Sequence, residues 1–195
     1  DEDKINYTLF RHQHEMAVEG HRFRWFLAPV NMRGGIQTAH ELAGRLRFTT
    51  VKDYQDWIGR LRNFSRYMDQ TIALMREGAQ TGVIHPRVIM ERVTGQITAQ
   101  IVEDPTQSLF YKPFKTLPDS FPQDVQNQLV AEAVQAISQG VIPAYRRFQV
   151  FFAREYLPKC PTGVGAWQAP HGQEMYAYFA RLYTTTKLTP EEIHN

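Results

Sequence analysis

The longest apolar stripe in the chain is the feature that most constrains its fold. From Pro122 to Tyr156, apolar residues recur every three or four positions, which is the spacing of one face of an α-helix. Pro143 lies inside this run and should kink the helix, because proline removes a backbone donor and clashes with the preceding turn. The stripe consists of Val125, Leu129, Ala133, Ile137, Val141, Tyr145, Phe148, Phe152 and Tyr156.

The same spacing recurs in the rest of the chain, and alternation with a period of two is rare. It predicts an all-α fold of long antiparallel helices. Thr49 and Thr50, with Asp53 in the first turn, are a helix start, and a break is expected near Asn63. The other helices are expected at about 3–26, 38–46, 51–62, 64–78, 86–104 and 176–183.

Two stretches lack a clear period. Residues 106–121 contain two prolines and should form an ordered loop, anchored by Leu109, Phe110, Tyr111 and Phe114. Residues 158–172 are rich in both Gly and Pro and should form a loop or a short hairpin. Because no linker or composition shift divides the chain, residues 1–195 are expected to form a single unit.

The segment Leu188–His194, just before Asn195, has the sequence of a helix start. Thr189 can cap it, Pro190 suits the first helical position, and Glu192 lies at the capping-box position. An isolated helical turn is unstable, so a longer segment and a packing partner are expected to accompany it. We therefore expect residues 1–195 to be a fragment of a larger helical domain, whose missing C-terminal half is its partner.

Composition argues against several classes of protein. The net charge of +2, from 22 basic and 20 acidic residues, gives no electrostatic footprint for binding a nucleic acid. No apolar run approaches the length of a membrane span. The single cysteine, Cys160, cannot form an intrachain disulfide.

The histidine pairs do not match a known zinc motif. His14-Glu15 and His40-Glu41 each resemble the start of His-Glu-x-x-His, but Val18 and Gly44 occupy the position of the second histidine. No metal ligand and no catalytic residue is predicted within these residues.

A Gly-rich segment near the end of the chain is the best candidate for contacting a ligand. Small residues permit close backbone approach, while a Trp and a His offer ligand contacts. The alternative is a purely structural turn in which Trp167 packs on the core. The candidate substrate-lining residues are Gly163, Gly165, Trp167, His171, Gly172 and Tyr176.

Short motifs follow one another along the chain in a specific order. Together they resemble the N-terminal half of the bacterial domain-of-unknown-function family 885. His171 departs from that pattern, in which an acidic residue is expected between Pro and Gly. The motifs are Phe48-Thr-Thr-Val-Lys-Asp-Tyr54, Arg60-Leu61, Met68-Asp-Gln70, Arg76-Glu-Gly-Ala-Gln-Thr-Gly82, Pro86-Arg87, Phe121-Pro122, Ile142-Pro-Ala-Tyr145, Tyr156-Leu-Pro158, Pro170-His-Gly172 with Tyr176, and Thr184-Thr-Thr186 ahead of Leu188.

The resemblance implies a helical bacterial protein that is periplasmic or lipid-anchored. It also implies an organisation similar to zinc carboxypeptidases and oligopeptidases, in which long helices surround a deep cleft. The family's His-Glu and Pro-Gly-His-His motifs lie downstream of the part matched here. Zinc is therefore expected only in the full-length protein, and these residues would shape one side of the cleft.

Two function classes follow. In the first, the chain is the cleft wall of a zinc metallopeptidase-like hydrolase that acts on peptides and is not catalytic by itself. In the second, it is a non-catalytic helical module that binds a peptide or a partner through the loop from Gly163 to Gly172. A fragment of this kind should also expose apolar surface, through which it could form a homodimer.

Overall fold

The computed structural model describes residues 1–194, and Asn195 lies outside the described residues. These residues contain helices and no β-strand, which confirms the all-α prediction. The elements are α1 (Glu2–His21), η1 (Trp25–Leu27), η2 (Ile36–Gly44), α2 (Val51–Arg62), α3 (Phe64–Thr81), α4 (Arg87–Thr98), η3 (Pro105–Gln107), η4 (Leu109–Phe114), α5 (Gln123–Ala136), η5 (Ile137–Val141), α6 (Ile142–Phe151), η6 (Phe152–Tyr156), η7 (Leu157–Lys159), η8 (Ala166–Gln168), α7 (Gly172–Thr184) and α8 (Pro190–His194). Segments η5 and η6 are π-helical, and the other η segments are 3₁₀ helices.

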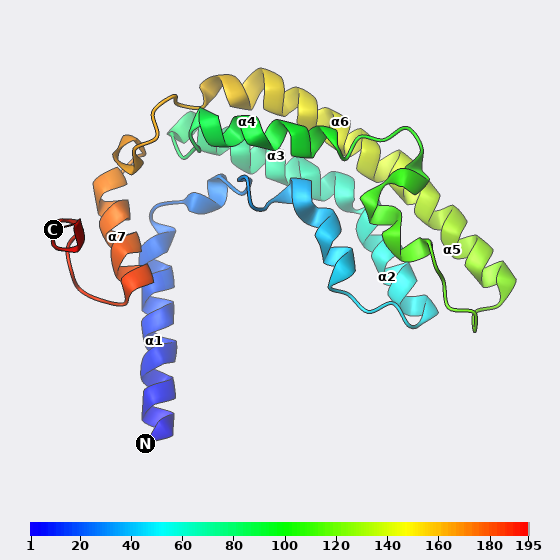
Figure 1. The fold of residues 1–195 in the computed structure, drawn as a ribbon, viewed down its shortest axis with the longest axis horizontal. Helices are drawn as coiled ribbons and strands as arrows, with labels where there is room; N and C mark the ends of the chain where they lie inside the picture. The colour runs from blue at the N-terminus through cyan, green and yellow to red at the C-terminus, as the bar shows by residue number, and fades with distance from the viewer. Residues whose placement is uncertain (195) are drawn as a thin grey trace.

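The helices form an arch (Figure 1). One rod consists of α2 followed by α3, and a second consists of α5 followed by α6, with α2 packed on α5 and α3 on α6. Helix α4 lies beside α6, while η1 and η2 lie on the inner side of the arch. At the other end, α1 and α7 form a separate pair.

The second rod is helical without interruption from Gln123 to Tyr156. The π-helical turn η5 comes directly before Pro143, and the amide of Ile142 donates to the carbonyl of Ile137. A wider turn at this point relieves the clash that proline would cause in an α-helix. At the predicted kink, the rod contains a π-helical segment and stays continuous, and it bends along the arch (Figure 1).

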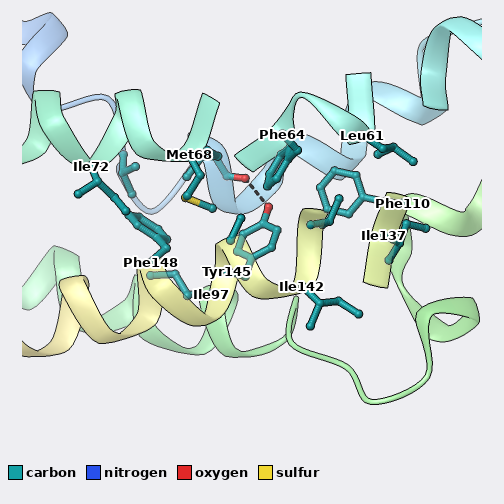
Figure 2. Packing of buried hydrophobic residues seen from close by; sticks show 14 of the residues in the cluster. Leu61, Phe64, Met68, Ile72, Ile97, Phe110, Ile137, Ile142, Tyr145 and Phe148 are labelled. Atoms are coloured by element: carbon teal, nitrogen blue, oxygen red, sulfur yellow. Dashed lines mark hydrogen bonds between the residues drawn. The ribbon is translucent and has the colours of Figure 1, made fainter. Parts of the chain in front are cut away.

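The centre of the arch is a cluster of buried aromatic side chains (Figure 2). The ring of Phe64 lies 5.2 Å from that of Phe110 and 5.3 Å from that of Tyr145, measured between centroids. The hydroxyl of Tyr145 is fully buried and donates to the carbonyl of Ile36 at 2.6 Å, shown by the dashed line in Figure 2. These contacts join α3, η4, α6 and η2.

The predicted helix starts are confirmed in atomic detail. Thr50 Oγ1 accepts from the Asp53 amide, while Asp53 Oδ2 accepts from the amides of Thr50 and Thr49. Thr189 and Glu192 form the same reciprocal pair at the start of α8, with distances of 2.7 and 3.2 Å.

Several predicted boundaries differ from the structure. The first helix ends at His21 rather than Phe26, because Arg24 adopts a left-handed conformation with a φ of 55°. Helix α4 ends at Thr98 rather than near Asp104, since the amides of Gln100 and Ile101 bond three residues back and tighten the last turn.

Two further expectations need correction, and the alternative left open for residues 158–172 is resolved in favour of a loop. The loop at 106–121 is largely 3₁₀-helical, and Leu109 is exposed, because η4 directs Phe110, Tyr111 and Phe114 inward instead. Residues 158–172 form a loop with two short 3₁₀ turns and no hairpin. Helices α4 and α6 pack antiparallel, as do α1 and α7. The two rods run parallel, because α4 carries the chain back in the opposite direction after α3 and before α5 (Figure 1).

We predict that Tyr145→Phe destabilises the protein by about 0.5–1.5 kcal/mol, because the buried carbonyl of Ile36 would lose the hydroxyl as a donor. Chemical denaturation measures this change. Tyr7→Phe is the matched control, since the Tyr7 side chain is exposed. Equal stability of the Tyr145→Phe and Tyr7→Phe proteins would contradict the prediction.

A second prediction concerns pH. Hydrogen bonds from the amides of Thr50 and Thr49 lower the pKa of Asp53 from 3.8 to about 2. A carboxyl group with a lowered pKa contributes stability that is full above its unfolded value and is lost as the pH falls through the folded value. Asp53→Ala should therefore lower the melting temperature at pH 7, with a difference from the wild type that narrows between pH 4 and pH 2.

Asp56→Ala is the control for this experiment, because it removes a carboxylate from the same helix outside the cap. A pH-independent difference for Asp53→Ala would show that the cap carboxylate does not act as described.

Candidate functional site

An apolar cavity of about 450 Å³ lies between η2, the junction of α2 and α3, and η4. Its volume is within the usual range for small-molecule and side-chain binding sites. Since η2 runs along the inner side of the arch, the cavity lies at the inner layer of the structure (Figure 1). Its lining residues are Gly35, Ala39, Leu42, Trp57, Arg60, Leu61, Asn63, Phe64, Tyr67 and Phe110.

The floor of this cavity is rigid. The rings of Trp57 and Phe110 are stacked, with centroids 6.3 Å apart, and Phe64 meets Phe110 edge to face. The indole of Trp57 also donates to the carbonyl of Phe110 at 3.1 Å. All three side chains are at most 6% exposed, so the floor belongs to the core and is formed before any ligand arrives.

The rim of the cavity is more exposed and carries the polar groups. Leu42 is 40% exposed and Tyr67 is 52% exposed. Arg60 is the charged member of the lining set, and among the described residues no carboxylate lies within 4 Å of its guanidinium. The amide of Asn63 is already used, since its Nδ2 donates to the carbonyl of Gly59 at 2.9 Å.

A buried glutamine holds η2 in position above this floor. Gln37 is fully buried, and its Nε2 donates to the carbonyls of Asn31 and Gly34 at 2.7 and 3.2 Å. It also contacts the side-chain oxygen of Gln96 on α4. One wall of the cavity is thereby tied to the neighbouring helix.

His40 is the histidine closest to this region. Its ring meets Phe110 edge-on, and burial lowers its pKa, which favours the neutral imidazole. Within residues 1–194, its buried Nδ1 makes no hydrogen bond of good geometry. The lining set contains no His, Cys, Asp or Glu, and its titratable members are Arg60 and Tyr67.

The sequence-predicted loop lies elsewhere, between the second rod and α7 (Figure 1). Its glycines permit close packing of the loop on itself. A Cβ at Gly163 would lie 2.0 Å from the Gln168 side chain, and one at Gly165 would lie 2.3 Å from the Trp167 indole. Trp167 is 72% exposed, so the alternative that placed it on the core is wrong.

The remaining predicted residues lie at the start of α7. His171 adopts a left-handed conformation with a φ of 55° just before the helix, and its Nδ1 lies 3.5 Å from a carboxylate oxygen of Glu174. Gly172 is buried under the backbone of Ala166 and Trp167, while Tyr176 is 41% exposed. None of the six predicted residues lines the apolar cavity, and their role as substrate-lining residues stays a prediction.

The cavity was not predicted from the sequence, because Trp57 and Phe64 in its floor belong to the apolar stripes of α2 and α3. The apolar stripe that contains Trp57 and Leu61 on α2 continues at Phe64 on α3, beyond the break at Asn63. This continuity was the feature of the sequence that pointed to the site of the cavity. A stripe predicts which side chains are buried but does not show that they leave a hollow.

In the described part of the chain, no cluster of three or more His, Cys, Asp or Glu side chains could hold a metal ion. The Cys160 thiol is buried, and burial raises its pKa to about 11, which makes it a poor nucleophile at neutral pH.

No helix within residues 1–194 is long and apolar enough to cross a membrane.

The packing of the loop leads to a third prediction. In Gly172→Ala, the new Cβ would lie 2.3 Å from the carbonyl oxygen of Ala166, so the loop must move and its amides should exchange faster with solvent. Gly95→Ala is the matched control, because a Cβ there meets nothing within 4 Å and helix propensity should stabilise the protein by about 0.5–1 kcal/mol. Hydrogen exchange measures both variants, and unchanged exchange in Gly172→Ala would contradict the described packing.

The chain is similar to the crystal structure of "the putative lipoprotein from Colwellia psychrerythraea", with a TM-score of 0.73 and 21% sequence identity. The match covers 86% of this chain and 29% of that chain. This chain therefore spans less than a third of the length of the matched protein, and the similarity concerns the fold of that part. No functionally curated protein matches this chain.

A family profile, described as "Bacterial protein of unknown function (DUF885)", matches residues 1–195. This match agrees with the family that the order of motifs in the sequence indicates, and the motifs lie within the helical arch and its connecting loops. The chain therefore belongs to the DUF885 family of bacterial proteins.

Proposed function

We propose that this chain forms the helical wall of a substrate cleft in a larger bacterial hydrolase of the zinc metallopeptidase type. The observation that carries the proposal is the preformed apolar cavity between η2, α2, α3 and η4. Its floor is rigid, it opens at exposed Leu42 and Tyr67, and it has the volume of a side-chain binding pocket. Such a pocket can hold a peptide substrate while residues elsewhere carry out the chemistry.

The described residues do not themselves fit a zinc ion, because no three His, Cys, Asp or Glu side chains converge in them. The proposal therefore assigns the zinc ligands to the rest of the full-length protein and derives no catalytic step here. The matched crystal structure is consistent with that division, since 29% of its chain corresponds to this chain.

The same proposal makes the rest of the full-length protein the main partner of this chain. Helix α1 supports it, because Met16 is its buried residue while five apolar side chains are more than half exposed. A helix with so little packing gains stability from a partner that covers these residues. They are Ile5, Tyr7, Leu9, Phe10 and Val18, and a homodimer through the same surface is the alternative.

The proposed location is outside the cytoplasm, either periplasmic or lipid-anchored. Two considerations support it: the resemblance noted in the sequence, and the description of the similar Colwellia protein as "the putative lipoprotein".

A second candidate function is a non-catalytic helical module that binds a peptide or a partner. The observation that favours it is the exposure of two large apolar side chains in the loop from Gly163 to Gly172. Val164 and Trp167 are each 72% exposed, and exposed apolar residues on a loop are typical of recognition surfaces.

The fourth prediction separates the two candidates. The full-length protein should contain stoichiometric zinc, measured by metal analysis, and should hydrolyse members of a quenched-fluorescence peptide library. Chelation should abolish the hydrolysis and added zinc should restore it.

Ala39→Phe, which fills the cavity, should raise KM for apolar peptides, whereas Gln123→Ala on exposed α5 should leave it unchanged. Absence of hydrolysis with zinc or any other divalent metal would overturn the hydrolase and favour the binding module.

A further inference from the structure

The charge distribution around the apolar cavity indicates what kind of group it accepts. Nine of its ten lining residues carry no charge, and the tenth is Arg60. Arg62, two residues further along α2, pairs with Glu132 at 2.7 Å. Among the described residues, no carboxylate lies within 4 Å of the Arg60 guanidinium.

An unpaired guanidinium at the rim of an apolar hollow is complementary to an anion attached to an apolar group. Guanidinium groups form paired hydrogen bonds with carboxylates, and the low polarity of a hollow lined by aromatic rings strengthens such a pair. The ligand's apolar part would meet Trp57, Phe64 and Phe110, while its carboxylate would meet Arg60.

We propose that this cavity binds an apolar group joined to a carboxylate, with Arg60 as the residue that selects for the charge. The proposal rests on the proposed function, since it names the ligand chemistry of the same cavity. The carboxylate could belong to the C-terminal residue of a peptide or to a fatty acid, and both sources present the same chemistry to Arg60.

The size of the site agrees with this chemistry. A cavity of about 450 Å³ has room for one large side chain and the adjoining main-chain atoms, whereas an engineered apolar cavity of about 150 Å³ already holds benzene. Since Trp57 and Phe110 are fixed by stacking and by the indole hydrogen bond, little ordering is needed when a ligand enters.

The test is calorimetric binding to the full-length protein, with ligands that differ in one feature at a time. N-acetyl-phenylalanine supplies the apolar side chain and the carboxylate, its C-terminal amide removes the charge, and N-acetyl-glycine removes the side chain. Decanoate presents the carboxylate on an aliphatic chain and so distinguishes the two sources. We expect N-acetyl-phenylalanine or decanoate to bind, and the two neutral or truncated compounds to bind at least about fivefold more weakly.

Arg60→Gln should weaken binding of the carboxylates by about fivefold and leave binding of the amide unchanged. Arg66→Gln is the matched control, because Arg66 lies on exposed α3 surface and does not line the cavity. Both residues are exposed, so neither substitution should disturb folding, and circular dichroism would verify this.

Two results would overturn the inference: affinities for N-acetyl-phenylalanine and for decanoate that are both no higher than that for the neutral amide, or equal loss of affinity in the Arg60 and Arg66 variants. Binding does not depend on turnover or on zinc. Arg60-dependent binding by a protein without hydrolytic activity would therefore overturn the proposed function and sustain this inference. Hydrolytic activity without Arg60-dependent binding would sustain the proposed function and overturn this inference.

Discussion

The hydrogen bond from the Tyr145 hydroxyl to the carbonyl of Ile36 is the contact on which the rest of the arch depends. It joins residues 109 positions apart, and it is made where Phe64 and Phe110 exclude water from both groups. A buried hydroxyl and a buried carbonyl are each costly unless they pair, so the bond fixes η2 against the second rod. The cavity exists because η2 is held at that position.

The second rod provides the other half of this arrangement. It remains helical through Pro143 because the π-helical turn η5 precedes the proline. Ile137 and Val141, within that turn, stay fully buried, so the wider turn keeps the apolar stripe directed at the core. A bend at this point lets one rod follow α2 and then α3 along the arch, where two straight helices would diverge.

Two surfaces of the molecule have different physical characters. The apolar cavity is preformed, rimmed by Arg60, and built from core residues that also stabilise the fold. The loop from Gly163 to Gly172 exposes Val164 and Trp167, and its residues Ala166 and Ala169 pack against the small cluster between α1 and α7. Substitutions in the cavity floor will therefore alter stability and binding together, whereas substitutions in the loop act locally. Rim positions such as Arg60 are the ones that separate the two effects.

The sequence by itself determined the class of structure and most of its elements. Helical periodicity identified the buried faces of α2, α3, α5 and α6, and the local chemistry of Thr50 with Asp53 located a helix start, because both depend on residues a few positions apart. Only the tertiary structure decided that the rods run parallel, that Leu109 faces solvent, and that a cavity lies beside Trp57 and Phe110. These features depend on contacts between residues distant in sequence, and periodicity carries no information about which faces meet or what space remains between them.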